Sequence, residues 1–256
     1  MKICRKIMEF LEPRCQDLKI KDVRIGLGYT AVQLDDNRTG VAFTMGKDAE
    51  GCCSAFPGSV QLAGRSAIDL LRLLESPVLL ETVVGLATAN ALSNVRPAAA
   101  IAGDVLDAVA MVPQDRVAMI GYFHPLVSSL EKRVARLDIF DERAEGATGV
   151  QPPEHAPDVL PTCDVALITS TTLINATIDL LLESAVNCRE VVLLGSSTPL
   201  LPEAFHGTPV TLLSGITIDD PAGILRVVSE GRGTRFFKPF ASKWNLPVRS
   251  SIAGTG

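Results

Sequence analysis

The spacing of apolar and polar positions differs between the first and the second part of the chain. In the first part, apolar residues spaced by three and four positions predict an amphipathic helix over about 2–18. Ser76 and Pro77 have the form of a helix cap followed by proline, which predicts a second helix ending near residue 92. Between them, three runs with turn residues after the second predict a hairpin or meander of strands: 23–27, 29–34 and 41–45. The first part is therefore predicted to be α+β.

From about residue 116 the pattern of apolar positions changes to short apolar runs that alternate with helical segments. Strands that are apolar on both faces are typical of a parallel sheet between two helix layers, and right-handed crossovers then produce a doubly wound sheet. We predict an α/β fold with an α+β domain over 1–95 and a Rossmann-like domain over 96–256, connected through about 96–115. The predicted strands are 116–121, 134–140, 164–168, 190–194 and 209–213.

Composition narrows the possible partners. A net charge of −5 and an aromatic content of 5% argue against nucleic-acid binding. The longest apolar candidate for a membrane span, 97–112, contains Asp104 and Asp107 and is shorter than the roughly 20 residues that a span needs. The N-terminus lacks the continuous apolar core of a secretory signal. We therefore predict a cytoplasmic protein without a membrane partner, and the apolar composition suggests a homo-oligomer, with a dimer as the expectation.

The six cysteines show no C-x-x-C spacing, and reduced thiols are the expectation for a chain without an export signal. Cys163 and Cys188 adjoin apolar runs, which favours burial. Cys52 and Cys53 differ because they form a vicinal pair in a glycine-rich stretch. Such a pair can bind a soft metal ion, or it can have no chemical role, and the sequence leaves both interpretations open.

Small polar residues follow several of the predicted strands. In an open α/β sheet, ligands bind beyond the carboxyl ends of the strands, where the strand order reverses. Free backbone N–H groups near a helix start suit a phosphate, a carboxylate or another oxyanion. Serine and threonine are also routine helix caps, so a structural role is the alternative. The candidates are Gly121, Thr171, Thr172, Asn175, Gly195, Ser196, Ser197 and Thr198.

Signals for a specific reaction are incomplete. The G-x-G-x-x-G fingerprint of dinucleotide sites is absent after the first strand of the second part. Asp138 and Asp141 lie where a ribose-binding acid would follow the second strand, but without the glycine fingerprint the sequence favours a solvated loop carboxylate. His124, at a strand end, is a candidate metal ligand or general base, or else a solvent-exposed residue at a helix start. His124 and Asp141 are therefore the catalytic candidates, and no reaction is assigned.

A basic segment over 231–238 follows the last predicted helix. Its two arginines and one lysine, set among glycines, could close over an anionic ligand. Alternatively, it is a solvated tail whose phenylalanines dock on the core.

Five stretches of the chain together carry a resemblance. They are Tyr29-Thr30-Ala31-Val32, Gly85-Leu86-Ala87 with Asn90-Ala91, Thr171-Thr172-Leu173-Ile174-Asn175 with Thr177-Ile178-Asp179, Leu194-Gly195-Ser196-Ser197-Thr198-Pro199-Leu200 and Gly233-Thr234-Arg235-Phe236-Phe237-Lys238. With these stretches the chain resembles, over nearly its whole length, a family described as putative heavy-metal chelation. The resemblance implies a domain similar to the enolase N-terminal domain joined to a Rossmann-like domain. It implies a ligand site in the cleft between them, faced by Thr30 and Asn90 from the first domain and by the strand-end residues of the second.

Three functions follow as hypotheses. In the first, the chain binds, and could process, a small polar or anionic ligand such as a metal chelate or metallophore, so that the cofactor is a transition-metal ion or its complex. Neutral donors would come from Asn90, Thr172, Asn175 and Ser197, and charge or coordination from His124 or Asp141. In the second, an enzyme uses an adenine nucleotide or S-adenosylmethionine in the Rossmann-like domain. In the third, a homo-oligomeric structural protein retains a vestigial pocket filled by large apolar side chains.

Overall fold

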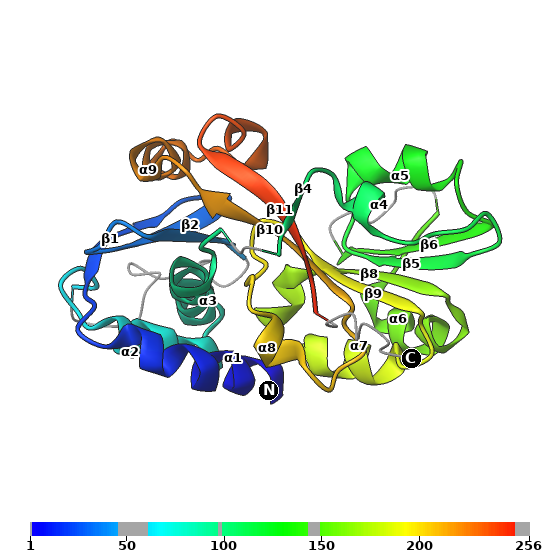
Figure 1. The fold of residues 1–256 in the computed structure, drawn as a ribbon, viewed down its shortest axis with the longest axis horizontal. Coiled ribbons are helices and arrows are strands. Elements are labelled where there is room, and N and C mark those ends of the chain that lie inside the picture. Colours follow the sequence, from blue (N-terminus) through cyan, green and yellow to red (C-terminus); the bar gives the residue numbers. More distant parts are fainter. Residues whose placement is uncertain (1, 46–60, 97–98, 143–148, 249–256) are drawn as a thin grey trace, which may run out of the picture.

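The chain folds around two β-sheets of different size (Figure 1). A computed structural model describes residues 2–45, 61–96, 99–142 and 149–248. The first sheet has three antiparallel strands in the order β1-β2-β3. The predicted first helix ends early because Pro13, which lacks an N–H group, lies in a short 3-10 turn that follows it. The elements are α1 (Lys2–Leu11), β1 (Ile20–Ile25), β2 (Tyr29–Leu34), β3 (Thr39–Phe43), α2 (Ala67–Leu71) and α3 (Leu79–Ser93).

The second sheet has eight strands in the order β4-β11-β10-β9-β8-β5-β6-β7. Its strands are β4 (Ile101–Ala102), β5 (Arg116–Ile120), β6 (Arg136–Phe140), β7 (Val150–Gln151), β8 (Val165–Thr169), β9 (Glu190–Leu194), β10 (Leu212–Ile218) and β11 (Ala241–Pro247). The helices between them are α4 (Val105–Ala108), α5 (His124–Leu130), α6 (Ala156–Val159), α7 (Ile178–Ser184), α8 (Pro202–Phe205) and α9 (Pro221–Ser229).

The parallel part of this sheet reverses its direction of growth between β5 and β8. From β5 the chain adds β6 and then β7 on one side, and afterwards β8, β9 and β10 on the other. This is the strand order of doubly wound sheets, whose ligands bind at the reversal. The predicted α/β fold class is confirmed, while the likeness of the first part to the enolase N-terminal domain stays a prediction.

Two antiparallel strands extend the sheet beyond the prediction. β11 pairs with β10 along its whole length, and β4 pairs with β11. The last predicted strand, 209–213, is displaced, because β10 starts at Leu212 and continues to Ile218 to meet β11. An antiparallel edge on a parallel sheet is common. The mixed polar and apolar sequence of β11 lacks the continuous apolar run that identified the central strands.

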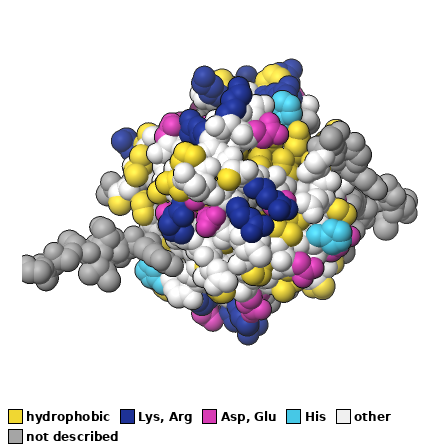
Figure 2. Space-filling view, turned by 90° about the vertical axis from the view of Figure 1, so that its right-hand side faces the viewer, with side chains coloured by type: hydrophobic (Ala, Val, Ile, Leu, Met, Phe, Trp, Pro, Cys, Tyr) yellow, Lys and Arg dark blue, Asp and Glu magenta, His cyan; other side chains and the backbone are white. Residues whose placement is uncertain are grey.

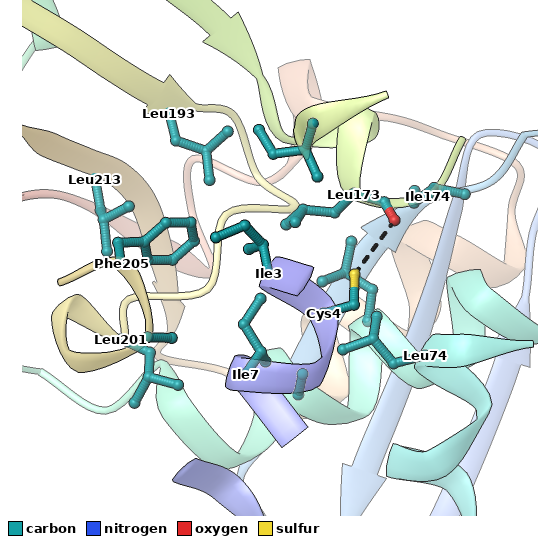
Figure 3. Packing of buried hydrophobic residues seen from close by; sticks show 14 of the residues in the cluster. Ile3, Cys4, Ile7, Leu74, Leu173, Ile174, Leu193, Leu201, Phe205 and Leu213 are labelled. Atoms are coloured by element: carbon teal, nitrogen blue, oxygen red, sulfur yellow. Dashed lines mark hydrogen bonds between the residues drawn. The ribbon is translucent and has the colours of Figure 1, made fainter. Parts of the chain in front are cut away.

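One hydrophobic core joins the two parts of the chain. Ile3 and Ile7 of α1 are buried in the same cluster as Phe205 and Leu213, which belong to the second part (Figure 3). Beside them, the Cys4 thiol donates to the Leu173 carbonyl oxygen at 3.6 Å. Folding of either part alone would expose apolar surface that the other part covers, so we expect the two to unfold together.

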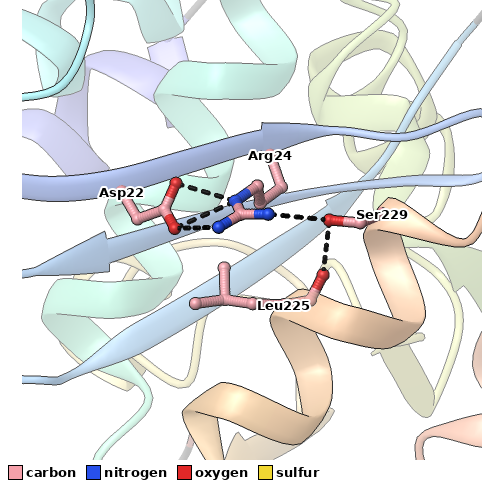
Figure 4. Close-up of polar contacts among 4 residues, drawn as sticks. All are labelled: Asp22, Arg24, Leu225 and Ser229. Carbon is pink, nitrogen blue, oxygen red and sulfur yellow. Dashed lines mark hydrogen bonds and ion pairs between the residues drawn. The ribbon is translucent and has the colours of Figure 1, made fainter.

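Helix α9 follows the second sheet in the sequence but covers the first sheet (Figure 1). Its residue Val228 is buried in one cluster with Ala31 and Val41. In Figure 4, Arg24 of β1 contacts Asp22 with an Nη2–Oδ2 distance of 2.7 Å and donates to the Ser229 hydroxyl at 3.2 Å. The division at residue 95 stays a prediction, and packing across it is extensive.

The surface carries both signs of charge. On the face drawn in Figure 2, lysine and arginine side chains lie among acidic and apolar ones. Two basic side chains pair with mostly buried carboxylates, Arg136 with Asp138 and Arg189 with Asp115, each at 2.8 Å. Among the helices that the structure describes, none has the length and apolar character needed to cross a bilayer.

Candidate functional site

Several predicted ligand-binding residues join the two sheets through hydrogen bonds. The Phe43 amide, at the end of β3, donates to the Ser197 hydroxyl at 2.8 Å. The Asn90 amide group of α3 donates to the Val41 carbonyl oxygen at 2.8 Å and to the Ser197 carbonyl oxygen at 3.0 Å. Asn90 and Ser197 are almost completely buried. These contacts hold α3 and β3 against the loop that follows β9. We call this junction between α3, β3 and the loop the seam.

Asn94 continues the seam one helical turn beyond Asn90, a spacing that places both on one face of the chain. Its amide nitrogen donates to the Thr198 and Ile216 carbonyl oxygens, both at 3.0 Å, and its side-chain oxygen accepts from the Leu200 amide at 2.8 Å. Sequence reasoning missed this residue. Its spacing from Asn90 was the available signal, and its role is to bind buried backbone groups.

A cavity of about 290 Å³ opens at the carboxyl ends of β5, β6 and β8, where the strand order reverses. Two larger cavities, of about 510 and 410 Å³, lie elsewhere: none of their described lining residues is at the end of β5 or β6. We call the first cavity the switch-point pocket. Its described lining residues come from both parts of the chain: Leu27, Phe43, Thr44, Met45, Ile120, Gly121, Phe140, Asp141, Glu142, Pro153, Thr169, Thr171, Thr172, Asn175 and Thr177.

Five of the predicted residues line this pocket, namely Gly121, Asp141, Thr171, Thr172 and Asn175. The others do not line it. Thr30 is buried behind it and shares a 3.0 Å hydrogen bond with the lining residue Thr44. Asn90, Ser197 and Thr198 belong to the seam, Gly195 and Ser196 lie in the adjoining turn, and His124 is exposed outside the pocket. The binding role of each residue stays a prediction.

Gly121 ends β5 and shapes the floor of the pocket. Its φ is +94°, a conformation that side chains disfavour. A Cβ atom there would lie 2.8 Å from Thr169 Cβ and 2.9 Å from Thr169 Cγ2. Glycine therefore allows the ends of β5 and β8 to approach each other at the reversal.

The threonine-rich loop after β8 uses several hydroxyl groups to form its own turn. The Thr169 hydroxyl caps this turn by accepting from the Thr171 amide at 3.4 Å, and the Thr172 hydroxyl donates to the Thr169 carbonyl oxygen at 2.6 Å. The side-chain oxygen of Asn175 accepts from the Thr177 hydroxyl at 2.8 Å. The structural interpretation of these hydroxyls thus accounts for part of the motif, and the resulting turn presents them along one wall of the pocket.

The pocket has an acidic lining. Asp141 is mostly buried, and its Oδ2 atom accepts from the Tyr122 amide at 2.7 Å, which connects the loops after β5 and β6. Glu142 lies beside it in the lining, and the described lining residues include no lysine, arginine or histidine. Among the described lining residues, the ionisable side chains are therefore acidic.

The basic segment after α9 adds no lining residue to the pocket among its described positions. Arg232 pairs with Glu230 at 3.1 Å and lies over the Phe236 ring at 4.7 Å. Phe237 is buried in the cluster beneath α9, whereas Phe236 is 46% exposed. Only one of the two phenylalanines therefore docks fully on the core.

Metal ligands do not cluster in the part of the chain that the structure describes, where no group of three His, Cys, Asp or Glu residues could hold an ion. All three histidines are exposed, and Figure 2 shows histidine side chains standing apart. Cys52 and Cys53 lie outside the described residues. The described lining offers oxygen atoms and one thioether from Met45.

The described cysteines are structural. Burial raises the pKa of the Cys4 thiol and of the Cys188 thiol to about 12, and that of Cys15 to about 11. Because the thiolate is the form that binds metals and reacts with electrophiles, these residues are poor ligands and poor nucleophiles near neutral pH.

We expect Cys4 to resist alkylation in the folded protein. At pH 8, iodoacetamide should leave the peptide containing Cys4 unmodified over a period that labels it completely in urea, as measured by mass spectrometry. The reason is that the thiol is both buried and protonated. Native labelling at the rate of the unfolded chain would contradict this account of Cys4.

Residues that the sequence did not identify also line the pocket, including Leu27, Thr44 and Thr177. Leu27 is 88% exposed and lies between Gly26 and Gly28 in the connection from β1 to β2. Thr44 directly follows β3, so its position past a strand end was a usable signal. The position of Leu27 in the pocket lining depends on how the first sheet packs against the second. The spacing of apolar residues along the sequence does not reveal that packing.

Comparison with known proteins gives a consistent fold. Two family models with the description putative heavy-metal chelation match residues 8–93 and 104–247. An uncharacterized protein of Methanocaldococcus jannaschii is 25% identical over 254 residues, covering 96% of each chain. A crystal structure of a protein with unknown function from the DUF364 family of Pyrococcus horikoshii has a TM-score of 0.85 at 23% identity, covering 96% of this chain and 99% of its own. A second DUF364 structure, from Desulfitobacterium hafniense, has a TM-score of 0.79 at 23% identity and covers 95% and 98%.

Proposed function

Because the chain belongs to the putative heavy-metal chelation family, we propose that it binds a small polar ligand, a complexed metal cation, in the switch-point pocket between its two parts. The observation that carries the proposal is the lining: Asp141 and Glu142 beside hydroxyl and amide groups, with no basic side chain among the described lining residues. We propose that this lining selects a complex with net positive charge over an anionic chelate, and probes of different charge test that selection.

A complex fits this lining better than a bare ion does. Transition metals such as nickel or zinc are held by several imidazole or thiolate ligands in proteins. The described residues supply two carboxylates at the pocket and no cluster of three candidate ligands. The hydroxyl groups of Thr171 and Thr177 and the amide of Asn175 are suited to hydrogen bonds with the organic part of a complex.

The proposal is tested by thermal unfolding with nickel probes that differ in charge. Nickel(II) chloride, the dication formed by nickel with triethylenetetramine, and the dianionic nickel–EDTA complex are compared. A ligand at about 100 times its Kd adds about 2.7 kcal/mol to the stability of the folded state. For a chain of this size we therefore expect the triethylenetetramine complex to raise Tm by about 5–10 °C, with no effect of the EDTA complex.

Replacement of Asp141 by asparagine removes the charge but keeps an oxygen atom that can accept from the Tyr122 amide. We expect Asp141→Asn to weaken binding of the cationic complex about 10–100-fold, measured by calorimetry. Asp158→Asn is the matched control, because Asp158 is an exposed carboxylate outside the pocket lining. The proposal fails if the EDTA complex binds better than the cation, or if both variants bind like the natural sequence.

Other expectations remain proposals. Of the two catalytic candidates, Asp141 lines the pocket and His124 does not, so any processing of the ligand would depend on Asp141. A cytoplasmic location, a homodimer and the absence of a nucleic-acid partner stay predictions.

A further inference from the structure

We propose that a second small-molecule site, separate from the switch-point pocket, binds an anionic amphiphile: a carboxylate with an apolar chain of medium length, such as decanoate. The site is the cavity of about 410 Å³ between α4 and the connection from α5 to β6, which we call the α4 cavity. Its described lining residues lie within 106–113 and 132–134. None of them lines the switch-point pocket, so the inference does not depend on the proposed function.

The α4 cavity exists because the helix layer is thin on one face of the large sheet. In Figure 1, α4 and α5 lie beside each other over β5 and β6. α4 has four residues and α5 has seven, fewer than the roughly 11 residues of an average helix. The chain from the end of α4 to the start of β5 is irregular. A hollow therefore remains between this segment and the α5–β6 connection.

The segment that forms one wall of the α4 cavity is held in place by the protein itself. Leu106 and Val109 are each 8% exposed and belong to the hydrophobic cluster beneath α4 and α5. Asp115 holds the end of the segment, because its Oδ2 atom accepts from the Val112 amide at 2.7 Å and from Arg189 Nη2 at 2.8 Å. The cavity is thus already formed, and binding there requires little ordering of the chain.

Most of the described lining is apolar. Five of the seven described lining residues have apolar side chains, namely Leu106, Val109, Met111, Pro113 and Val134. Burying hydrocarbon against such a surface is favourable in proportion to the area removed from water. The larger part of a matching ligand is therefore hydrocarbon.

The other two described lining residues, Lys132 and Arg133, are basic and exposed. Within the described ranges, neither forms an ion pair with a carboxylate. Asp107 and Glu131 adjoin lining residues in the sequence, but neither is among the described residues of the lining. Ammonium and guanidinium groups donate charge-assisted hydrogen bonds to a carboxylate. The lining therefore selects a hydrocarbon chain that ends in a negative group.

The surface around this site has the same mixed character. Figure 2 shows the right-hand side of Figure 1, which is the side of α4 and α5. Lysine or arginine side chains near the middle of this face lie next to apolar side chains. Although the chain has a net charge of −5, this face offers positive charge beside apolar surface, the combination that an amphiphilic anion requires.

The dimensions of the α4 cavity favour a small molecule over a protein partner. Cavities of about 300–1,000 Å³ accept drug-sized ligands, and the volume of about 410 Å³ lies in that range. A specific protein interface covers about 800 Å² on each partner and involves about 20–30 residues a side. The described lining comes from two short segments, which is too little for such an interface.

The inference is tested by calorimetry on the full chain with ligands that differ in length or in charge. Hexanoate, octanoate and decanoate are compared below the concentrations at which they form micelles, together with 1-octanol and octyltrimethylammonium. Each buried methylene group strengthens binding about fourfold, so we expect decanoate to bind about 15-fold more tightly than octanoate. We expect octanoate to bind about 10–100-fold more tightly than 1-octanol, and octyltrimethylammonium to bind most weakly.

The double variant Lys132→Gln/Arg133→Gln removes both cations from exposed positions, where folding does not depend on them. We expect it to bind decanoate about 10–100-fold more weakly than the natural sequence does, with its affinity for 1-octanol unchanged. Lys19→Gln/Arg226→Gln is the matched control, because it removes one lysine and one arginine at exposed positions outside the described lining. The control should bind decanoate like the natural sequence.

Several results would overturn the inference. One is equal binding of octanoate and 1-octanol, and another is a Kd that does not change with chain length. Decanoate binding that the double variant retains would place the ligand elsewhere, and an equal loss in the control would indicate a general effect of net charge. Failure of all three carboxylates to bind overturns the inference whatever the nickel–triethylenetetramine complex does, since the two sites share no described lining residue.

Discussion

Replacing Phe205 by alanine is expected to lower the free energy of unfolding by about 3–5 kcal/mol. The ring is completely buried, and it lies in the cluster that contains Ile3 and Ile7 of α1 (Figure 3). Removing it leaves a void where the first and last parts of the chain meet. Because this cluster is shared, urea unfolding followed by circular dichroism should show one transition at a lower midpoint.

Phe10→Ala serves as the control for this prediction. Phe10 belongs to the same helix, α1, but its side chain is 45% exposed, and we expect a loss below about 1 kcal/mol. Two separate transitions in Phe205→Ala, with only one of them shifted, would show that the parts fold independently and that the shared core is not decisive.

Replacing Gly121 by alanine is expected to lower the free energy of unfolding by about 2–4 kcal/mol and to reduce ligand binding at the same time. The backbone at +94° disfavours any side chain, and the new methyl group would also contact Thr169 at 2.8 Å. Relief of that contact requires the ends of β5 and β8 to separate, which changes the pocket. Denaturant unfolding and calorimetry with the nickel–triethylenetetramine complex measure the two effects.

Gly195→Ala separates backbone strain from the contact. Gly195 has a φ of +121°, but a Cβ atom there would meet nothing within 4 Å. We therefore expect Gly121→Ala to cost about 1–3 kcal/mol more than Gly195→Ala. Equal losses of unfolding free energy in the two variants would mean that the Thr169 side chain moves away from the new methyl group at little cost. The close approach of the ends of β5 and β8 would then be unimportant.

The central strands could be predicted because each is a continuous run of apolar residues in the sequence. The runs that became β5, β8 and β9 are apolar at successive positions, and burial on both faces of a sheet requires that pattern. β11 and the lengthened β10 could not be predicted, because their stability comes from pairing between segments separated in sequence. Helix α9 begins at Pro221 after the capping residue Asp220, a local signal, but its packing on the first sheet depends on residues distant in the sequence.

Part of the candidate site could also be predicted from local sequence, because several of its residues directly follow predicted strands. Gly121, Thr171 and Asn175 follow strands, and parallel strands bring such residues to one edge. Residues such as Asn90 and Ser197 also converge, but through hydrogen bonds to buried backbone groups. A sequence shows which side chains are polar without showing whether the backbone or a ligand binds them. The acidic character of the pocket likewise became evident only when Asp141 and the neighbouring lining residues were placed together.

The most direct measurement of the central claim is a crystal structure of the protein purified from its own host, with the difference density and anomalous signal inspected for a retained compound. The account predicts density in the switch-point pocket, in contact with Asp141 and Asn175. A compound bound instead in the cavity of about 410 Å³ that Leu106 of α4 and Val109 line, with ordinary solvent in the switch-point pocket, would contradict it.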